Sequence, residues 1–173
     1  MVIRSRHLLL TAGLLVLIIL SGIGSYLYLR PADEKMIRTQ FAKLTGLAAK
    51  NGKEGAIPAA GKARAIASLF SERTTFSVNA PDWMAGPFSR KDLSANIFRS
   101  RAMFTTLKLS LDDLELEIDS AKGTAKVFLS ASLTGTLKDG KTIREVRELE
   151  GTLSKTGEGW LFENFKVREI IKK

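Results

Sequence analysis

Alternating apolar and polar side chains in the second half of this 173-residue chain constrain its fold more than any other feature. Successive side chains of a β-strand point to opposite faces, so a period of two predicts strands with one apolar face. Apolar residues occupy odd positions up to Leu111 and even positions from Leu114 to Ile118. The phase changes at Asp112-Asp113, as one inserted residue of a β-bulge would cause.

Turn lengths bring the following strands into register with this one. A four-residue turn at 120–123 pairs Ile118 with Ala125 on the apolar face. A three-residue turn at 138–140, with its last glycine in the left-handed region, keeps the next strand in the same phase. A final strand over 160–170 is apolar on both faces. We therefore expect a meander of four long antiparallel strands.

The preceding part of the chain is expected to be mostly helical. Asp33 is the expected N-cap of the first helix, and Ser89 with Asp92 forms an S-x-x-D capping pair that opens the third. The expected order is a helix over 33–50, a link over 53–61, a helix over 62–72, a strand over 73–79, a loop over 82–88 and a helix from 89 to about 103.

This order resembles the nuclear transport factor 2-like (NTF2-like, cystatin-like) superfamily of cone-shaped α+β domains. The resemblance spans residues 33–173 and is carried by the first helix, by TTFSVNAPDWMAGPFSRKDLSANIF and by the meander ending in GEGWLFENFKVRE. It implies an α+β fold with helices packed on a curved, cone-shaped sheet, and a homodimer formed through the sheet face. The superfamily's short second strand is not evident, unless it lies within 80–88.

An uncharged run of 22 residues, Leu8 to Leu29, predicts a transmembrane helix. At about 1.5 Å per residue it would be roughly 33 Å long, enough to cross a hydrocarbon core of about 30 Å. The alternative is a cleaved secretory signal, whose apolar region is usually only about 7–15 residues long. We therefore divide the chain into a basic tail (1–7), an anchor (8–29), a linker (30–34) and one domain (35–173).

The orientation of this anchor depends on the charges that flank it. Basic residues are almost equally frequent on its two sides, but a short basic tail before a first apolar helix normally stays in the cytoplasm. We therefore expect a single-pass protein of the cell (inner) membrane with its domain in the periplasm.

The expected domain lacks the side chains most often used in catalysis. The only histidine, His7, precedes the anchor, both tyrosines lie inside it, and the chain has no cysteine. A ketosteroid-isomerase-like mechanism needs a carboxylate base and an oxyanion donor, typically tyrosine. No catalytic residue, metal ligand or cofactor site is therefore predicted. The alternative is an isomerase or cyclase of the same superfamily that depends on a carboxylate.

Three residues are candidates for lining a pocket: Trp83, Glu145 and Arg147. Glu145 and Arg147 lie on the inward-facing positions of their strand. They are candidate polar determinants of the pocket or candidates for an ion pair with a partner subunit, but the commoner explanation is a partly solvated pair near the pocket rim. Trp83, in the loop over 82–88, is a candidate lid or interface anchor, or else closes the core against the helices.

Positive charge is concentrated in the helical part of the expected domain. Residues 33–108 contain 13 Lys/Arg against 6 Asp/Glu, a net charge of +7, whereas residues 109–173 have a net charge of −1. Nucleic acid is not the expected partner, because the aromatic residues of a single-strand platform are absent. Attraction to anionic lipid or simple solvation of a basic face is expected for Lys50, Lys53, Lys62 and Arg64.

Together these features favour a membrane-anchored, non-enzymatic domain that mediates protein–protein contact or holds a small apolar ligand. A scaffold in an envelope assembly is a specific variant, because the bitopic inner-membrane component of type IV secretion systems is similar in architecture. This variant implies an envelope protein as partner.

Overall fold

The computed structural model of the protein describes residues 32–77 and 86–168. The membrane span expected at 8–29 and the candidate Trp83 lie outside these residues. Within them, no helix is both long and apolar enough to cross a bilayer.

The described residues form an α+β fold. The first helix covers residues 32–48. The elements that follow it are β1 (Lys50–Asn51), α2 (Ala56–Ala67), β2 (Phe70–Ser77), β3 (Gly86–Ser89), α3 (Arg90–Ala102), β4 (Phe104–Asp119), β5 (Thr124–Leu137), β6 (Thr142–Thr156) and β7 (Gly159–Val167).

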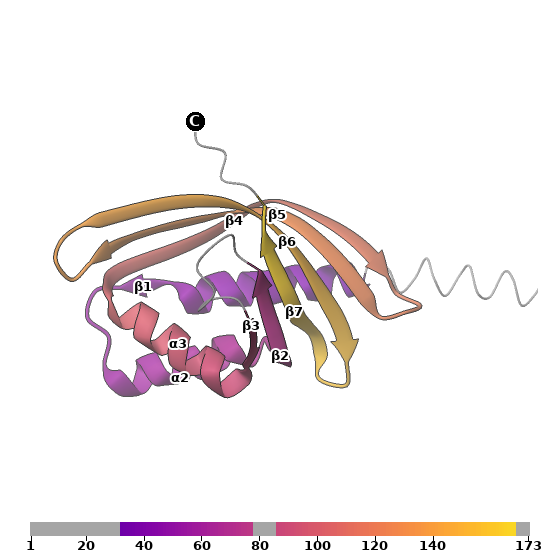
Figure 1. The fold of residues 1–173 in the computed structure, drawn as a ribbon, viewed down its shortest axis with the longest axis horizontal. Coiled ribbons are helices and arrows are strands. Elements are labelled where there is room, and N and C mark those ends of the chain that lie inside the picture. The colour runs from indigo at the N-terminus through magenta and orange to yellow at the C-terminus, as the bar shows by residue number, and fades with distance from the viewer. Residues whose placement is uncertain (1–31, 78–85, 169–173) are drawn as a thin grey trace, which may run out of the picture.

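The strands form a single curved sheet in the order β1-β4-β5-β6-β7-β2-β3. The long strands β4, β5 and β6 arch over the helices, and the first helix runs along the concave side (Figure 1). All neighbouring strands are antiparallel except β2 and β7. The expected meander is confirmed. In the described residues the sheet has seven strands, because it also contains β1 and β3, which were not predicted. β3 occupies part of the segment in which a second strand was sought.

The register predicted from the phase of the apolar residues is confirmed. Ile118 pairs with Ala125, and the register shifts between Asp112 and Glu115, where Asp113 has a φ of 54°. The turn at 138–140 closes with a hydrogen bond of 2.8 Å from Leu137 N to Lys141 O. Gly140 has a φ of 88°, the left-handed conformation that this turn requires.

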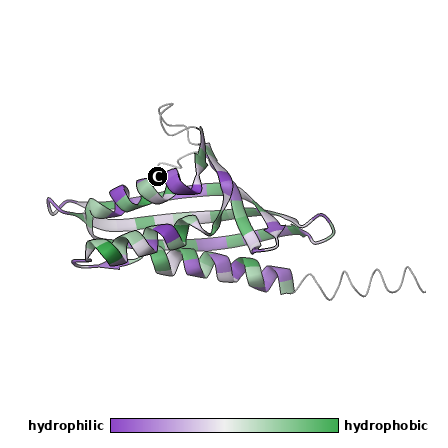
Figure 2. Ribbon diagram, turned by 90° about the horizontal axis from the view of Figure 1, so that it is seen from below, coloured by the Kyte–Doolittle hydropathy of each residue, from purple (hydrophilic) through white to green (hydrophobic). Residues whose placement is uncertain are grey.

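The first helix packs on the sheet through one face, and hydrophobic and hydrophilic residues alternate along its ribbon (Figure 2). Ile37 and Phe41 are buried against the sheet, with 0% and 4% of their surfaces exposed. Asp33 was predicted as the N-cap, but it lies inside the helix and is itself buried. Its carboxylate bonds to side chains of the sheet instead of the helix's own N–H groups.

The two remaining helices differ in how well their limits were predicted. α3 begins as expected, since Ser89 Oγ accepts a hydrogen bond of 3.1 Å from Asp92 N. α2 begins six residues earlier than expected, at Ala56, and ends at Ala67. The expected link over 53–61 contains Pro58, but proline is tolerated in the first turn, where N–H groups have no partner within the helix.

Candidate functional site

The concave side of the sheet carries a partly open cavity of about 180 Å³. Its walls come from the first helix and five strands, which meet where their apolar faces converge. The residues that line it are all apolar: Phe41, Leu44, Phe70, Phe76, Leu109, Leu111, Leu129, Ala131, Leu149, Phe165 and Val167.

Aromatic packing shapes one wall of this cavity. The rings of Phe76 and Phe165 are stacked with centroids 6.4 Å apart, and the centroid of Phe70 lies 6.3 Å from that of Phe165. The Phe165 ring lies against β6 at Gly151, where an added Cβ would come within 2.7 Å of it. The absence of a side chain at Gly151 therefore allows Phe165 to lie flat against the sheet.

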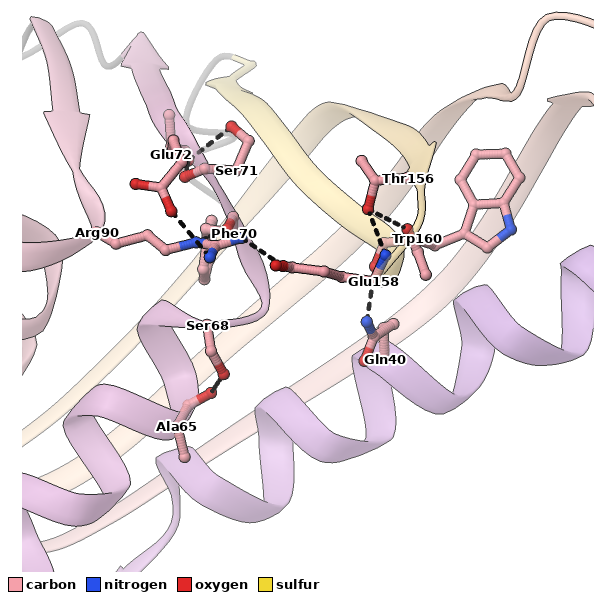
Figure 3. Close-up of polar contacts among 12 residues, drawn as sticks. Gln40, Ala65, Ser68, Phe70, Ser71, Glu72, Arg90, Thr156, Glu158 and Trp160 are labelled. Carbon is pink, nitrogen blue, oxygen red and sulfur yellow. Dashed lines mark hydrogen bonds and ion pairs between the residues drawn. The ribbon is translucent and has the colours of Figure 1, made fainter.

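Arg90 fixes the strand that carries Phe70. Its Nε donates a hydrogen bond of 2.8 Å to Phe70 O, and its two terminal nitrogens pair with Glu72 at 2.9 Å and with Glu158 at 3.0 Å (Figure 3). This side chain joins the start of α3 to β2 and to the turn before β7. Gln40, on the first helix, adds a link to β7: its Nε2 donates a hydrogen bond of 2.6 Å to Trp160 O.

Glu145 and Arg147 project to the sheet face that carries the cavity wall, but neither is among the residues that line the cavity. In the register of the sheet, Arg147 is opposite Ala131 and Glu145 is opposite Leu133, on the face that carries the cavity wall. The two form an ion pair, with Arg147 Nη2 3.2 Å from Glu145 Oε2. The side chain of Arg147 is 32% exposed and that of Glu145 is 51% exposed, which is the partly solvated arrangement considered from the sequence.

The basic candidates lie on the helical side of the fold and differ in their contacts. Lys50 Nζ donates to Phe104 O at 2.6 Å and to Arg101 O at 3.1 Å, and Lys62 pairs with Glu54 at 2.8 Å. Lys53 and Arg64 are exposed. Lys53 lines a surface groove of about 490 Å³ beside α3. Arg64 lines another groove, of about 500 Å³, between α2 and α3.

Lys50 and Lys53 are also distant from the point where the described chain begins. The first helix runs from residue 32 at one end of the fold to β1 at the other (Figure 1). A helix over residues 32–48 is roughly 25 Å long at about 1.5 Å per residue. A bilayer contact made by Lys50 and Lys53 therefore requires the domain to lie along the membrane surface. That contact stays a prediction.

Two buried charged groups hold the ends of the first helix. Asp33 Oδ1 accepts hydrogen bonds from Lys155 Nζ at 2.7 Å and from Trp160 Nε1 at 3.0 Å. Burial raises the pKa of Asp33, but these bonds and the Lys155 charge outweigh it and hold the pKa below the usual 3.8.

At the other end of the helix, Arg101 is 4% exposed, and its guanidinium donates to the carbonyls of Leu47 and Ala48 and pairs with Glu54 at 2.9 Å. Hydrogen bonds from Lys62 and Arg101 outweigh burial and lower the pKa of Glu54. These contacts explain why Arg101 is tolerated inside the fold, because positive charge is favourable at a helix C-terminus.

The fold is that of NTF2-like proteins with a cystatin-like architecture. An NTF2-like protein from Novosphingobium aromaticivorans superposes with a TM-score of 0.64 at 18% identity, covering 87% of this chain and 90% of that one. A protein of Streptomyces avermitilis, provisionally named a dehydratase of the NTF2-like family, gives 0.62 at 11% identity, covering 82% and 99%.

A further N. aromaticivorans protein, provisionally named an aromatic ring hydroxylase, gives a TM-score of 0.63 at 13% identity, covering 82% of this chain and 91% of that one. No family and no curated protein matches the sequence. At these identities the likeness establishes the fold alone.

Proposed function

We propose that this chain is a non-enzymatic binding protein that holds a small neutral apolar molecule in the cavity under its sheet. The observation that carries the proposal is the lining, which is apolar at every described position. Such a surface offers no hydrogen bond or charge to water, so filling it with an apolar molecule is favourable.

The volume of the cavity limits the size of this molecule. An apolar cavity of about 150 Å³ stays dry and binds benzene. At about 180 Å³, the cavity here suits a single ring with one or two small substituents. Ala131 contributes the smallest side chain of the wall, so it is the position at which a larger residue would fill the space.

Carboxylate-dependent catalysis is the alternative function, and the same lining weighs against it. A general acid or base must come within hydrogen-bond reach of the reacting group. Glu145 projects to the face of the cavity wall but does not line the cavity, and it is half exposed and paired with Arg147. The exposed Asp113 and Glu163 are not among the lining residues.

The test measures binding of 4-fluorotoluene to the full chain in nanodiscs of zwitterionic lipid. Fluorine NMR detects the binding as a protein-dependent shift. Ala131→Leu should abolish the protein-dependent shift because it fills the cavity. Ser132→Leu is the matched control: it is the next residue, it pairs with Val146 on the opposite face, and it should leave binding unchanged. Equal binding by both variants would contradict the proposal.

The proposal includes a tether formed by residues 8–29, with the domain on the periplasmic face of the inner membrane. Its support is the length and apolarity of that run. A reporter fused after Lys173 tests it, since activity of a cytoplasmic reporter would contradict this orientation. A homodimer or an envelope protein partner belongs to the same proposal, and native mass spectrometry of the full chain tests both.

A further inference from the structure

The cavity wall and the ion pair of β6 belong to the same face of the sheet. Leu111, Ala131 and Arg147 form one cross-strand row, because Leu111 pairs with Ala131 and Ala131 with Arg147. Directly paired residues have Cβ atoms about 5 Å apart and project to the same side. Two members of this row line the cavity, so the side chain of Arg147 starts beside its wall.

The neighbouring row repeats this arrangement. Leu109 pairs with Leu133, and Leu133 pairs with Glu145. Leu109 lines the cavity, whereas Glu145 continues its row outward onto β6. Leu149, two residues beyond Arg147 on the same face, also lines the cavity. The cavity therefore has an apolar lining, and β6, which contributes Leu149 to it, carries one acid and one base farther along the same face.

The ion pair itself is loosely held. In the described part of the chain, the Arg147 guanidinium meets only Glu145 Oε2 at 3.2 Å and Val146 O at 3.4 Å, both on its own strand. Pairs with this degree of exposure contribute about 0–1 kcal/mol. A ligand can thus displace Glu145 into solvent at small cost, leaving several N–H donors of Arg147 available.

We propose that the preferred ligand is a small apolar acid, with its ring in the cavity and its carboxylate on Arg147 in place of the Glu145 carboxylate. This inference rests on the proposed binding function and names its ligand class. Guanidinium and carboxylate form two parallel hydrogen bonds, which a lysine or an amide cannot reproduce. Glu145 acts as an internal competitor that occupies Arg147 when no acid is bound.

The experiment compares three probes on the full chain in zwitterionic nanodiscs: 4-fluorophenylacetate, its neutral amide 4-fluorophenylacetamide, and 4-fluorotoluene. Arg147→Met should lower the affinity for 4-fluorophenylacetate by about three- to tenfold and leave the affinity for both neutral probes unchanged. Glu145→Gln should raise the affinity for 4-fluorophenylacetate several-fold, because the competing carboxylate is gone. Arg144→Met is the matched control, since Arg144 lies three residues before Arg147 and projects to the opposite face of β6.

Each result separates this inference from the proposed function. If 4-fluorotoluene fails to bind, the cavity proposal is wrong. If it binds but Arg147→Met affects the acid and the amide equally, the cavity proposal stands and the acid preference is overturned. Acid binding that survives Ala131→Leu would mark adsorption on the basic helices, and this also overturns the inference.

Discussion

The indole of Trp160 donates a hydrogen bond of 3.0 Å to the buried carboxylate of Asp33, 127 positions earlier in the chain. Asp33 is 1% exposed and Trp160 is also 1% exposed. Together with Lys155, this contact attaches the start of the first helix to β7 and the end of β6. It thus fixes the helix that forms one wall of the cavity.

Replacing Asp33 should destabilise the fold. Asp33→Ala leaves the buried indole N–H without its acceptor and removes the charge that pairs with Lys155, so we expect a loss of about 2–3 kcal/mol in the free energy of unfolding. Urea denaturation measures it. Glu34→Gln is the control, because Glu34 is 45% exposed and, among the described residues, pairs with Arg38 alone; it should cost less than about 0.5 kcal/mol.

The lowered pKa of Asp33 predicts how stability depends on acidity. A carboxyl group whose pKa is lower when folded stabilises the fold above its usual pKa of 3.8, and this contribution is lost as the pH falls through the folded value. Between about pH 5 and pH 3, the native chain should therefore lose more stability than Asp33→Asn. Parallel curves for the two proteins would show that Asp33 does not carry this dependence.

Arg101 should matter far more than its neighbour Arg99. Arg101→Met leaves the carbonyls of Leu47 and Ala48 without the guanidinium and leaves Lys62 as the remaining basic partner of Glu54, and breaking such a buried pair costs about 3 kcal/mol. Arg99→Met, on the exposed surface of the same helix, should change the free energy of unfolding by less than about 0.5 kcal/mol. Similar effects of the two substitutions would refute this role.

The sheet was predictable because strand phase and turn length are local properties. The shift at Asp112-Asp113 and the left-handed Gly140 follow from parity alone, and both are present. The Ser89 cap was equally readable, because its partner is three residues away. Features of this kind need no knowledge of distant contacts.

The cavity and the helix anchors were not predictable in the same way. Phe41 and Phe76 line the cavity from two different elements, and their convergence depends on the curvature of the sheet. Asp33 resembled an N-cap because its true partners, Lys155 and Trp160, lie more than 120 positions away. Arg101 likewise has its partners Leu47, Ala48 and Glu54 far away in the sequence. The nearest signal for the cavity was the small Ala131 between larger apolar residues.

Two glycines should respond in opposite ways to alanine. At Gly135, an added Cβ would lie 2.7 Å from the backbone oxygen of Thr106 and 2.8 Å from Phe104, so Gly135→Ala should cost about 1–3 kcal/mol. At Gly46, within the first helix, a Cβ meets nothing within 4 Å. Gly46→Ala should therefore raise the melting temperature, with a gain of up to about 1 kcal/mol. Destabilisation at Gly46 would contradict the helix as described.

The bulge can be tested at Asp113, whose φ of 54° is unfavourable for branched side chains. Asp113→Val should lower the free energy of unfolding by about 1–2 kcal/mol, whereas Asp113→Asn should be nearly neutral, since asparagine tolerates this conformation. Asp112→Val is the control, because Asp112 is also exposed but pairs regularly with Ser130. Equal stability of the two valine variants would mean that the extra residue sits elsewhere. The phase change that turns Leu114 and Ile118 toward the core would then need another cause.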